Sequence, residues 1–173
     1  MKLSIDNFLL ELAPPGTYPD PNQVCAQLLP NGDAESSSGG NIFPFTVSGG
    51  RAAVVEDDDG NHFFRQSGRW AYYNRLEAKV NTGCLVQDAV YKVSAKVQVH
   101  WPDPTPAEIF AGSTQPDGST HWSTLILCPD SDENSGFVSC ERQMTFSPKL
   151  IAATGVTLFI RPRGIGASAS TVD

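Results

Sequence analysis

Residues 91–101 constrain the fold most strongly, because apolar and polar side chains alternate along them. The apolar set is Tyr91, Val93, Ala95, Val97 and Val99, and the polar set is Lys92, Ser94, Lys96, Gln98 and His100. A period of two places each set on one face of a β-strand. The stretch therefore predicts a long strand with one dry face and one wet face, as in a sheet that covers a core on one side.

Prolines and glycines interrupt the rest of the chain, with 13 Pro and 15 Gly in 173 residues. Between these breaks we expect further strands at 3–12, 24–29, 43–47, 52–55, 62–66, 76–80, 84–86, 108–112, 121–128, 137–146 and 156–161. No segment has the pattern of a helix. Many short strands with regular turn signals predict an all-β fold, a two-sheet antiparallel β-sandwich of jelly-roll type with little or no helix.

The length fits a single β-sandwich domain over residues 1–173. Residues 13–23 are rich in proline and are expected to form a linker. The strand at 3–12 precedes this linker, and residues 168–173 read as though a further strand should follow. Two explanations stay open: strand 3–12 closes the sandwich, as in a circular permutation, or it is the tail of a preceding repeat. In either case, a strand position left empty in the sheet would expose the edges of its neighbours. We therefore expect residues 3–12 to fill that position and to lie beside the turn at 31–35.

The formal net charge of −7 limits the classes of partner. Nucleic acids and anionic membranes attract clustered Lys and Arg, which this chain lacks, so neither is expected as a partner. No apolar run is long enough to cross a bilayer, so membrane insertion is not expected. The composition suits a module with a neutral ligand, and it leaves carboxylates available for Ca²⁺.

The four cysteines, Cys25, Cys84, Cys128 and Cys140, allow three pairings. Cys128 and Cys140 flank the polar segment 129–139, so a bridge between them could staple a hairpin or a loop. Cys25 would then pair with Cys84. Disulfides indicate an oxidising compartment and therefore a secreted, extracellular or cell-surface protein. The alternative is four buried free thiols.

Two acidic segments are candidate cation sites. In the first, Asn31 and Gly32 form a turn, and Asp33 and Glu35 follow it on the same side of an extended chain. The second is the acid run at 56–60, which lacks the spacing of an EF-hand loop, so a calcium site built from it would be discontinuous. The alternatives are a polar loop after a strand and a solvated charged turn.

The most aromatic stretch of the chain, residues 68–75, has the side chains that sugar binding needs. Sugar rings pack their C–H faces on flat aromatic rings while their hydroxyls bond to planar polar groups. Trp101 lies at the end of a predicted strand and Trp122 near the start of another. Each could be either a core residue or a sugar-binding residue. Some of the aromatic residues in 68–75 are expected to be core residues, because alternation buries every second one. The candidates for ligand contact are Arg69, Trp70, Tyr72, Tyr73, Asn74, Trp101 and Trp122.

Catalysis has little support in the sequence. No nucleophile elbow and no Gly-rich phosphate loop is present. A glycosidase needs two opposed carboxylates, and nothing marks Glu77, Asp103 or Glu108 as such a pair. The histidines are too scattered for a metal triad. We therefore predict that the chain is not an enzyme.

Four segments resemble motifs of the carbohydrate-binding modules of the family 4, 9 and 22 group. Residues 28–35 (LLPNGDAE) resemble the opening motif of that group, and residues 68–73 (GRWAYY) its Gly-Arg segment with a following aromatic. Residues 90–97 (VYKVSAKV) look like its Tyr-x-x-Ser-Ala-x-Val strand. Residues 5–11 (IDNFLLE) look like its closing strand, here placed at the front of the chain.

The resemblance implies a galactose-binding-like jelly roll with a sugar-binding face, a structural Ca²⁺ and no catalysis. It implies that Tyr73 stacks on a sugar. Ala34 stands where the group has Phe, and Tyr73 where it has Trp. The implied calcium ligands are Asp6, Gly32 through its carbonyl, Glu35, Asp58 and Asn61.

The predicted function is that of a non-catalytic carbohydrate-binding module of a secreted protein, which binds a polysaccharide or other glycan on exposed aromatic residues. The alternative is a structural or assembly repeat module of an extracellular or cell-surface protein. Such a module would pack against neighbouring copies and bind no sugar.

Overall fold

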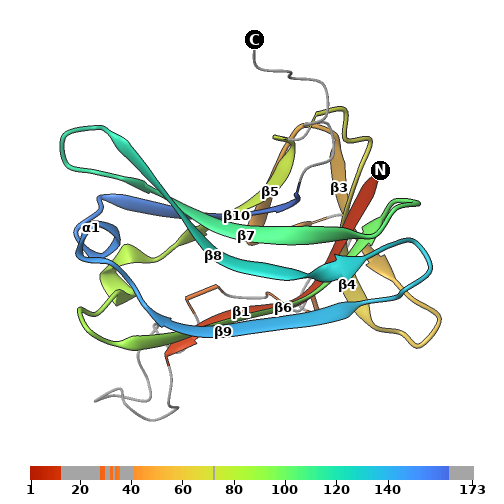
Figure 1. Ribbon diagram of the computed structural model, residues 1–173, viewed down its shortest axis with the longest axis horizontal. Helices are drawn as coiled ribbons and strands as arrows, with labels where there is room; N and C mark the ends of the chain where they lie inside the picture. The colour runs from red at the N-terminus through yellow and green to blue at the C-terminus, as the bar shows by residue number, and fades with distance from the viewer. Residues whose placement is uncertain (13–27, 30–31, 33, 36–40, 72, 164–173) are drawn as a thin grey trace.

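The computed structural model of the chain describes residues 1–12, 28–29, 32, 34–35, 41–71 and 73–163. Its strands form two five-stranded antiparallel sheets that lie one above the other (Figure 1). Sheet A has the strand order β3-β4-β1-β6-β9, and sheet B the order β2-β5-β10-β7-β8. The predicted all-β sandwich of jelly-roll type is confirmed.

The strands of sheet A are β1 (Lys2–Leu12), β3 (Arg51–Glu56), β4 (His62–Ser67), β6 (Val90–His100) and β9 (Val138–Thr145). The strands of sheet B are β2 (Phe45–Ser48), β5 (Arg75–Val80), β7 (Thr105–Thr114), β8 (Thr120–Ser131) and β10 (Gly155–Pro162). The helical elements of the described chain are the 3-10 turn η1 (Thr82–Cys84) and the single-turn helix α1 (Pro148–Ile151).

The core lies between the two sheets, and β6 shows how the sequence pattern builds it. Its apolar residues are almost fully buried, from 0% exposed for Tyr91 and Val93 to 3% for Ala95. They pack against inward residues of sheet B such as Leu158 and Ile160, which belong to the same buried cluster. The dry face predicted from residues 91–101 is therefore the inner face of sheet A.

Strand β1 is the central strand of sheet A, between β4 and β6. It pairs with β4 only from Leu3 to Ile5, and a bulge between Asp6 and Leu9 interrupts its pairing with β6. Within the bulge the Phe8 amide donates to the Gly32 carbonyl at 2.8 Å. The turn therefore lies beside β1, as expected, where β4 no longer pairs with it. Whether β1 reflects a permutation or a preceding repeat stays a prediction, and linker 13–23 lies outside the described residues.

Two of the predicted strands are not found as expected. Residues 84–86 do not form a strand: Thr82–Cys84 is a 3-10 turn, because the Asn81 side chain accepts from the Gly83 amide and caps it. The local turn chemistry of an Asx cap thus outweighs a short apolar run. Of the predicted strand 24–29, residues 24–27 lie outside the described part, while Leu28 and Leu29 form a bend.

The predicted Cys128–Cys140 disulfide is present, with the two Cα atoms 5.1 Å apart. It staples neither a hairpin nor a loop within one sheet, because Cys128 lies in β8 of sheet B and Cys140 in β9 of sheet A. The bridge therefore ties the edges of the two layers together. Cys84 is buried at 2% exposure, and its predicted partner, Cys25, lies outside the described residues.

Candidate functional site

The outer face of sheet B carries a cluster of three aromatic rings. Phe110 in β7 and Phe159 in β10 are register partners, and their rings stack with centroids 5.1 Å apart. Trp122 in β8 completes the cluster, 5.8 Å from Phe110 and 5.2 Å from Phe159. None of the three belongs to the buried core cluster of the described residues, because the alternating residues Leu158 and Ile160 point inwards instead. The cluster therefore faces away from the core.

Two arginines cover the phenylalanine rings and hold planar polar groups at this face. The Arg75 guanidinium lies 4.3 Å from the Phe159 centroid, and that of Arg161 lies 4.7 Å from the Phe110 centroid. Each arginine also has a carboxylate partner. Arg75 Nε donates to Glu77 at 3.0 Å, and Arg161 Nη2 donates to Glu108 at 3.2 Å. Stacking and ion pairing together restrict both guanidinium groups to one orientation.

A hollow of about 250 Å³ opens over these groups. Phe110 and Phe159 are only 7% and 6% exposed beneath the arginines, whereas Trp122 is 51% exposed. The hollow thus offers one broad aromatic surface beside several fixed hydrogen-bonding groups, which is the chemistry that a sugar ring requires. Its lining residues are Arg75, Glu108, Phe110, Trp122, Ser123, Thr124 and Arg161.

Gly112 makes room for the aromatic cluster. It is the register partner of Trp122, and its position on β7 has no side chain between the Trp122 and Phe159 rings. A Cβ atom at this position would lie 2.8 Å from a ring carbon of each. That separation is too short for a normal contact, so the ring arrangement requires glycine here.

Trp122 is the one residue lining this hollow that the sequence predicts as a ligand contact. Glu108, Phe110 and Arg161, which also line it, occupy outward positions of the strands predicted at 108–112 and 156–161. The alternation of side chains along these strands does indicate which residues share a face. Phe159 and Arg161 share the outward parity of β10, and Glu108 and Phe110 share that of β7. What sequence alone could not supply is the strand order that places these pairs side by side.

The predicted aromatic loop precedes Arg75 and is held by its own side chains. Asn74 is 1% exposed, and its Oδ1 accepts from the Trp70 and Ala71 amides at 2.9 Å each. Arg69 is 8% exposed and donates through Nε to the Asn74 carbonyl at 2.9 Å. Both side chains therefore build the loop, and we assign them to its structure rather than to ligand contact. Burial lowers the pKa of Arg69 to about 10, and the nearby positive charge of Arg161 adds to this effect.

This framework presents two aromatic residues to solvent. Trp70 is 71% exposed and Tyr73 is 43% exposed, and their rings meet edge to face with centroids 5.4 Å apart. The loop that carries this pair leads directly into Arg75, which lines the hollow on sheet B. Tyr72 lies outside the residues described with side chains, and Trp101 is half-buried against the core.

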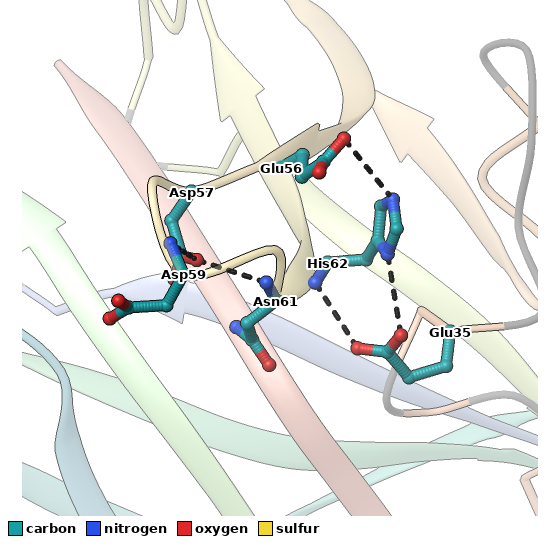
Figure 2. Close-up of polar contacts among 6 residues, drawn as sticks. All are labelled: Glu35, Glu56, Asp57, Asp59, Asn61 and His62. Carbon is teal, nitrogen blue, oxygen red and sulfur yellow. Dashed lines mark hydrogen bonds and ion pairs between the residues drawn. The ribbon is translucent and has the colours of Figure 1, made fainter.

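The predicted acidic segments meet at His62, the first residue of β4. Figure 2 shows the His62 ring between two carboxylates, with Nδ1 3.3 Å from Glu35 and Nε2 3.8 Å from Glu56. The His62 amide also donates to Glu35 at 3.1 Å, and this bond lowers the pKa of the Glu35 carboxyl. Asp57 holds the turn at 57–61 together, because its Oδ1 accepts a hydrogen bond from the Asn61 amide at 3.0 Å (Figure 2). The structure thus brings residues 35 and 56–62 together.

Asp6 is the buried carboxylate of this region. It is 2% exposed, and one of its oxygens accepts from the Asn7 side chain at 3.0 Å and lies 3.9 Å from Lys96. The other oxygen, Oδ1, is buried without a hydrogen-bond partner. Burial raises the pKa of Asp6, while the Lys96 charge and the neighbouring Asn61 side chain oppose this shift. A buried, unpartnered carboxylate oxygen is costly, and a cation is one group that satisfies it.

The other predicted calcium ligands are arranged around this carboxylate to different degrees. Asn61 and Glu35 are close enough to Asp6 to influence its protonation. The Gly32 carbonyl accepts from Phe8, and Asp58 is exposed. Within the described part of the chain, no three His, Cys, Asp or Glu side chains form a metal-binding cluster. A calcium site here would therefore depend on carbonyl and amide oxygens as well as carboxylates.

No helix in the described segments is long and apolar enough to cross a membrane. No family model matches the sequence, and no curated protein matches it. Solved structures do match the fold. The CBM22-1 xylan-binding domain of Paenibacillus barcinonensis Xyn10C aligns with a TM-score of 0.59 and 16% identity, covering 72% of this chain and 78% of that domain.

The CBM22-2 xylan-binding domain of the same enzyme aligns with a TM-score of 0.58 and 13% identity, over 77% of this chain and 84% of that one. The CBM22-1-GH10 modules of Clostridium thermocellum endo-1,4-beta-D-xylanase 10B, complexed with xylohexaose, align with a TM-score of 0.57 and 14% identity. That match covers 69% of this chain and 23% of the longer one. At these identities the comparisons establish a shared jelly-roll fold.

Proposed function

We propose that this chain is a non-catalytic carbohydrate-binding module that holds a glycan on the outer face of sheet B. The observation that supports this most directly is the half-exposed Trp122 ring beside the paired guanidinium and carboxylate groups of Arg75, Glu108 and Arg161. A sugar ring placed on Trp122 would bury its C–H face there. Its hydroxyls would then lie within reach of side chains that are already oriented.

The same groups favour binding over cleavage. A glycosidase needs one protonated and one ionised carboxyl group on opposite sides of the scissile bond. Among the described residues, Glu108 is the one carboxylate that lines the hollow, and it is ion-paired with Arg161. The hollow therefore lacks the opposed pair of carboxyl groups.

Xylan is the first glycan to test, because the solved domains that share this fold are described as xylan-binding. Titration calorimetry of wild-type protein with xylohexaose should show binding, and Trp122→Ala should weaken it by about tenfold or more. Val86→Ala removes an apolar side chain of similar exposure, 47%, from a loop that does not line the hollow. This control should bind as wild type does. Equal affinity of wild type and Trp122→Ala would exclude Trp122 as the stacking residue.

The loop with Trp70 and Tyr73 is proposed as a flanking contact for the same glycan. Its exposed edge-to-face pair is rigidly supported, so it can bind a sugar without a large loss of conformational freedom. Tyr73→Ala should weaken xylohexaose binding less than Trp122→Ala does. If Tyr73→Ala has the larger effect, the principal site is the loop and not the sheet.

A structural Ca²⁺ is proposed at Asp6, with Glu35, Asn61, Asp58 and the Gly32 carbonyl as further ligands. The unpartnered Asp6 oxygen supports this assignment. A cation there would neutralise the buried charge and connect β1 to the acidic turn. Thermal unfolding with added calcium and then with a chelator tests it, because an ion that binds only the folded state must raise the midpoint.

The proposed setting is outside the cell, as part of a secreted or cell-surface protein. The Cys128–Cys140 bridge supports this, because such bonds persist in oxidising compartments. Mass spectrometry of alkylated protein taken directly from its source would test it. An unlabelled Cys128–Cys140 pair is expected, and free thiols at both positions would contradict the assignment.

A further inference from the structure

A second hollow, of about 480 Å³, lies on the same outer face of sheet B, at the edge formed by β2. One wall is the segment that leads into β2, and the floor consists of outward residues of β5 and β10. Phe43 is 55% exposed at its rim. The lining residues are Asn41, Ile42, Phe43, Pro44, Phe45, Thr46, Glu77, Lys79 and Thr157.

The wall that carries Phe43 is a fixed turn. The Phe45 amide donates to the Ile42 carbonyl at 2.7 Å, and the Phe43 amide donates to the Asn41 side chain at 3.0 Å. Phe45, the first residue of β2 after the turn, is 3% exposed in the core, where its ring contacts that of Phe64. The backbone that supports the Phe43 ring is therefore anchored on both sides.

The strand register connects this hollow to the one at Trp122. One row of outward positions runs from Trp122 to Gly112, from Gly112 to Thr157, and from Thr157 to Lys79. At Gly112 the Trp122 and Phe159 rings fill the space over the backbone, so an apolar ring surface continues along the row. The row begins in the first hollow and ends in the second.

A second link joins the two hollows directly. Arg75 lines the first and Glu77 lines the second, and they are bonded to each other at 3.0 Å. Five strands lie side by side in this sheet, so the two ends of the face are about 19 Å apart.

We propose that the Phe43 hollow is a second sugar-binding subsite, and that one glycan chain lies across sheet B from Trp122 to Phe43. This inference rests on the proposed function. The Phe43 ring supplies an apolar surface for a sugar C–H face, and Lys79, Glu77 and Thr157 supply partners for hydroxyls. The ligand class is accordingly a chain of several sugar units that crosses the strands, and not a single sugar or a chain end held at Trp122 alone.

The experiment compares chain lengths in wild-type protein and two variants. Calorimetry is performed with the series from xylobiose to xylohexaose. Wild-type affinity should continue to rise with length until both hollows are filled. Phe43→Ala should leave the affinity for xylobiose unchanged and lower that for xylohexaose by about tenfold, while Trp122→Ala should weaken binding throughout the series.

Val86→Ala serves as the control, because it removes an exposed apolar side chain outside both hollows. Thermal unfolding of Phe43→Ala should match wild type, since the ring is more than half exposed. If Trp122→Ala weakens binding while Phe43→Ala binds every length as wild type does, the second subsite is wrong and the proposed function stands. If wild type binds no member of the series, the inference and the xylan assignment fail together.

Discussion

The Arg75 guanidinium lies over the Phe159 ring, 4.3 Å from its centroid, and is bonded at the same time to Glu77. A planar cation held between a ring and a carboxylate cannot rotate freely. It therefore presents its remaining N–H groups to the hollow in a fixed direction. This one side chain connects the aromatic cluster, the first hollow and, through Glu77, the floor of the second.

Arg75→Ala should weaken xylohexaose binding by about tenfold, because it removes oriented donors and leaves Glu77 without its partner. Stability should fall by about 1 kcal/mol or less, since the side chain is partly exposed and the stacking is worth little in water. Arg75→Lys keeps the charge and loses the planar fork, so it should not restore affinity. Full binding by Arg75→Lys would show that charge alone matters here.

Gly112→Ala tests whether the ring arrangement depends on the missing side chain. The new Cβ would lie 2.8 Å from the Trp122 and Phe159 rings, so one of them must move. We expect a loss of about 1–3 kcal/mol in the free energy of unfolding by urea, as for other overpacked positions. Xylohexaose affinity should fall as well, because Trp122 is displaced.

The matched control for this variant is Gly155→Ala at the start of β10, where an added Cβ has no atom within 4 Å. It should change neither stability nor binding by a measurable amount. If Gly112→Ala binds as tightly as wild type, the Trp122 ring can adapt its position, and the fixed-cluster description is wrong.

The sandwich could be predicted because its signals are local. The alternation at 91–101 requires only a period of two, and turn residues mark the strand ends. The failure at 84–86 has a local cause too: the Asn81 cap competes with strand formation over a very short segment. Short apolar runs after Asn, Thr and Gly are where such competition decides the outcome.

The candidate site was predicted less well, for a topological reason. Phe110 and Phe159 are 49 residues apart in sequence (159 minus 110) and become neighbours only because β7 pairs with β10. The loop at 68–75 was noticed because its aromatic residues are contiguous. Within that loop the sequence could not distinguish exposed Trp70 from buried Asn74. Asn74 is buried because its side-chain oxygen accepts a hydrogen bond from the Trp70 amide, and this bond exists only in the folded loop.

His100 should make stability depend on pH in the mildly acidic range. Its Nε2 lies 2.8 Å from the Ser4 hydroxyl, and burial, with the charges of Arg65 and Lys2, lowers its pKa below 6.5. The unfolded chain therefore takes up a proton at a higher pH than the folded protein does. The stabilisation is complete above 6.5 and is lost as the pH falls through the folded-state pKa.

Urea unfolding at a series of pH values, with an NMR titration of the histidine rings, measures this effect. His100→Gln should flatten the slope of stability against pH below 6.5. His121→Gln, on β8 of the other sheet, should keep the slope. A wild-type slope in His100→Gln would assign the effect to another group.

The Cys128–Cys140 bridge should contribute strongly to stability, because it closes a loop with a sequence separation of 12 between strands of different sheets. Replacing both cysteines by serine should lower the free energy of unfolding by about 3 kcal/mol, the value expected for a loop of this length. Glycan affinity should persist while the variant is folded, since neither cysteine lines a hollow. A change below 1 kcal/mol would indicate that other contacts already hold the two edges together.

Asp6→Asn should abolish calcium binding without unfolding the protein. In wild type we expect calcium to raise the unfolding midpoint, with about 2.7 kcal/mol of stabilisation at a hundredfold excess over its dissociation constant. The amide keeps the shape of Asp6 and removes the buried charge, so the metal-free variant should be at least as stable as metal-free wild type. The stability of Asp6→Asn should no longer respond to calcium or to a chelator.

The control is Asp103→Asn, which changes an exposed acid and should respond to calcium as wild type does. A full calcium response in Asp6→Asn would place the ion elsewhere, and no response in wild type would remove the structural calcium from the proposed function.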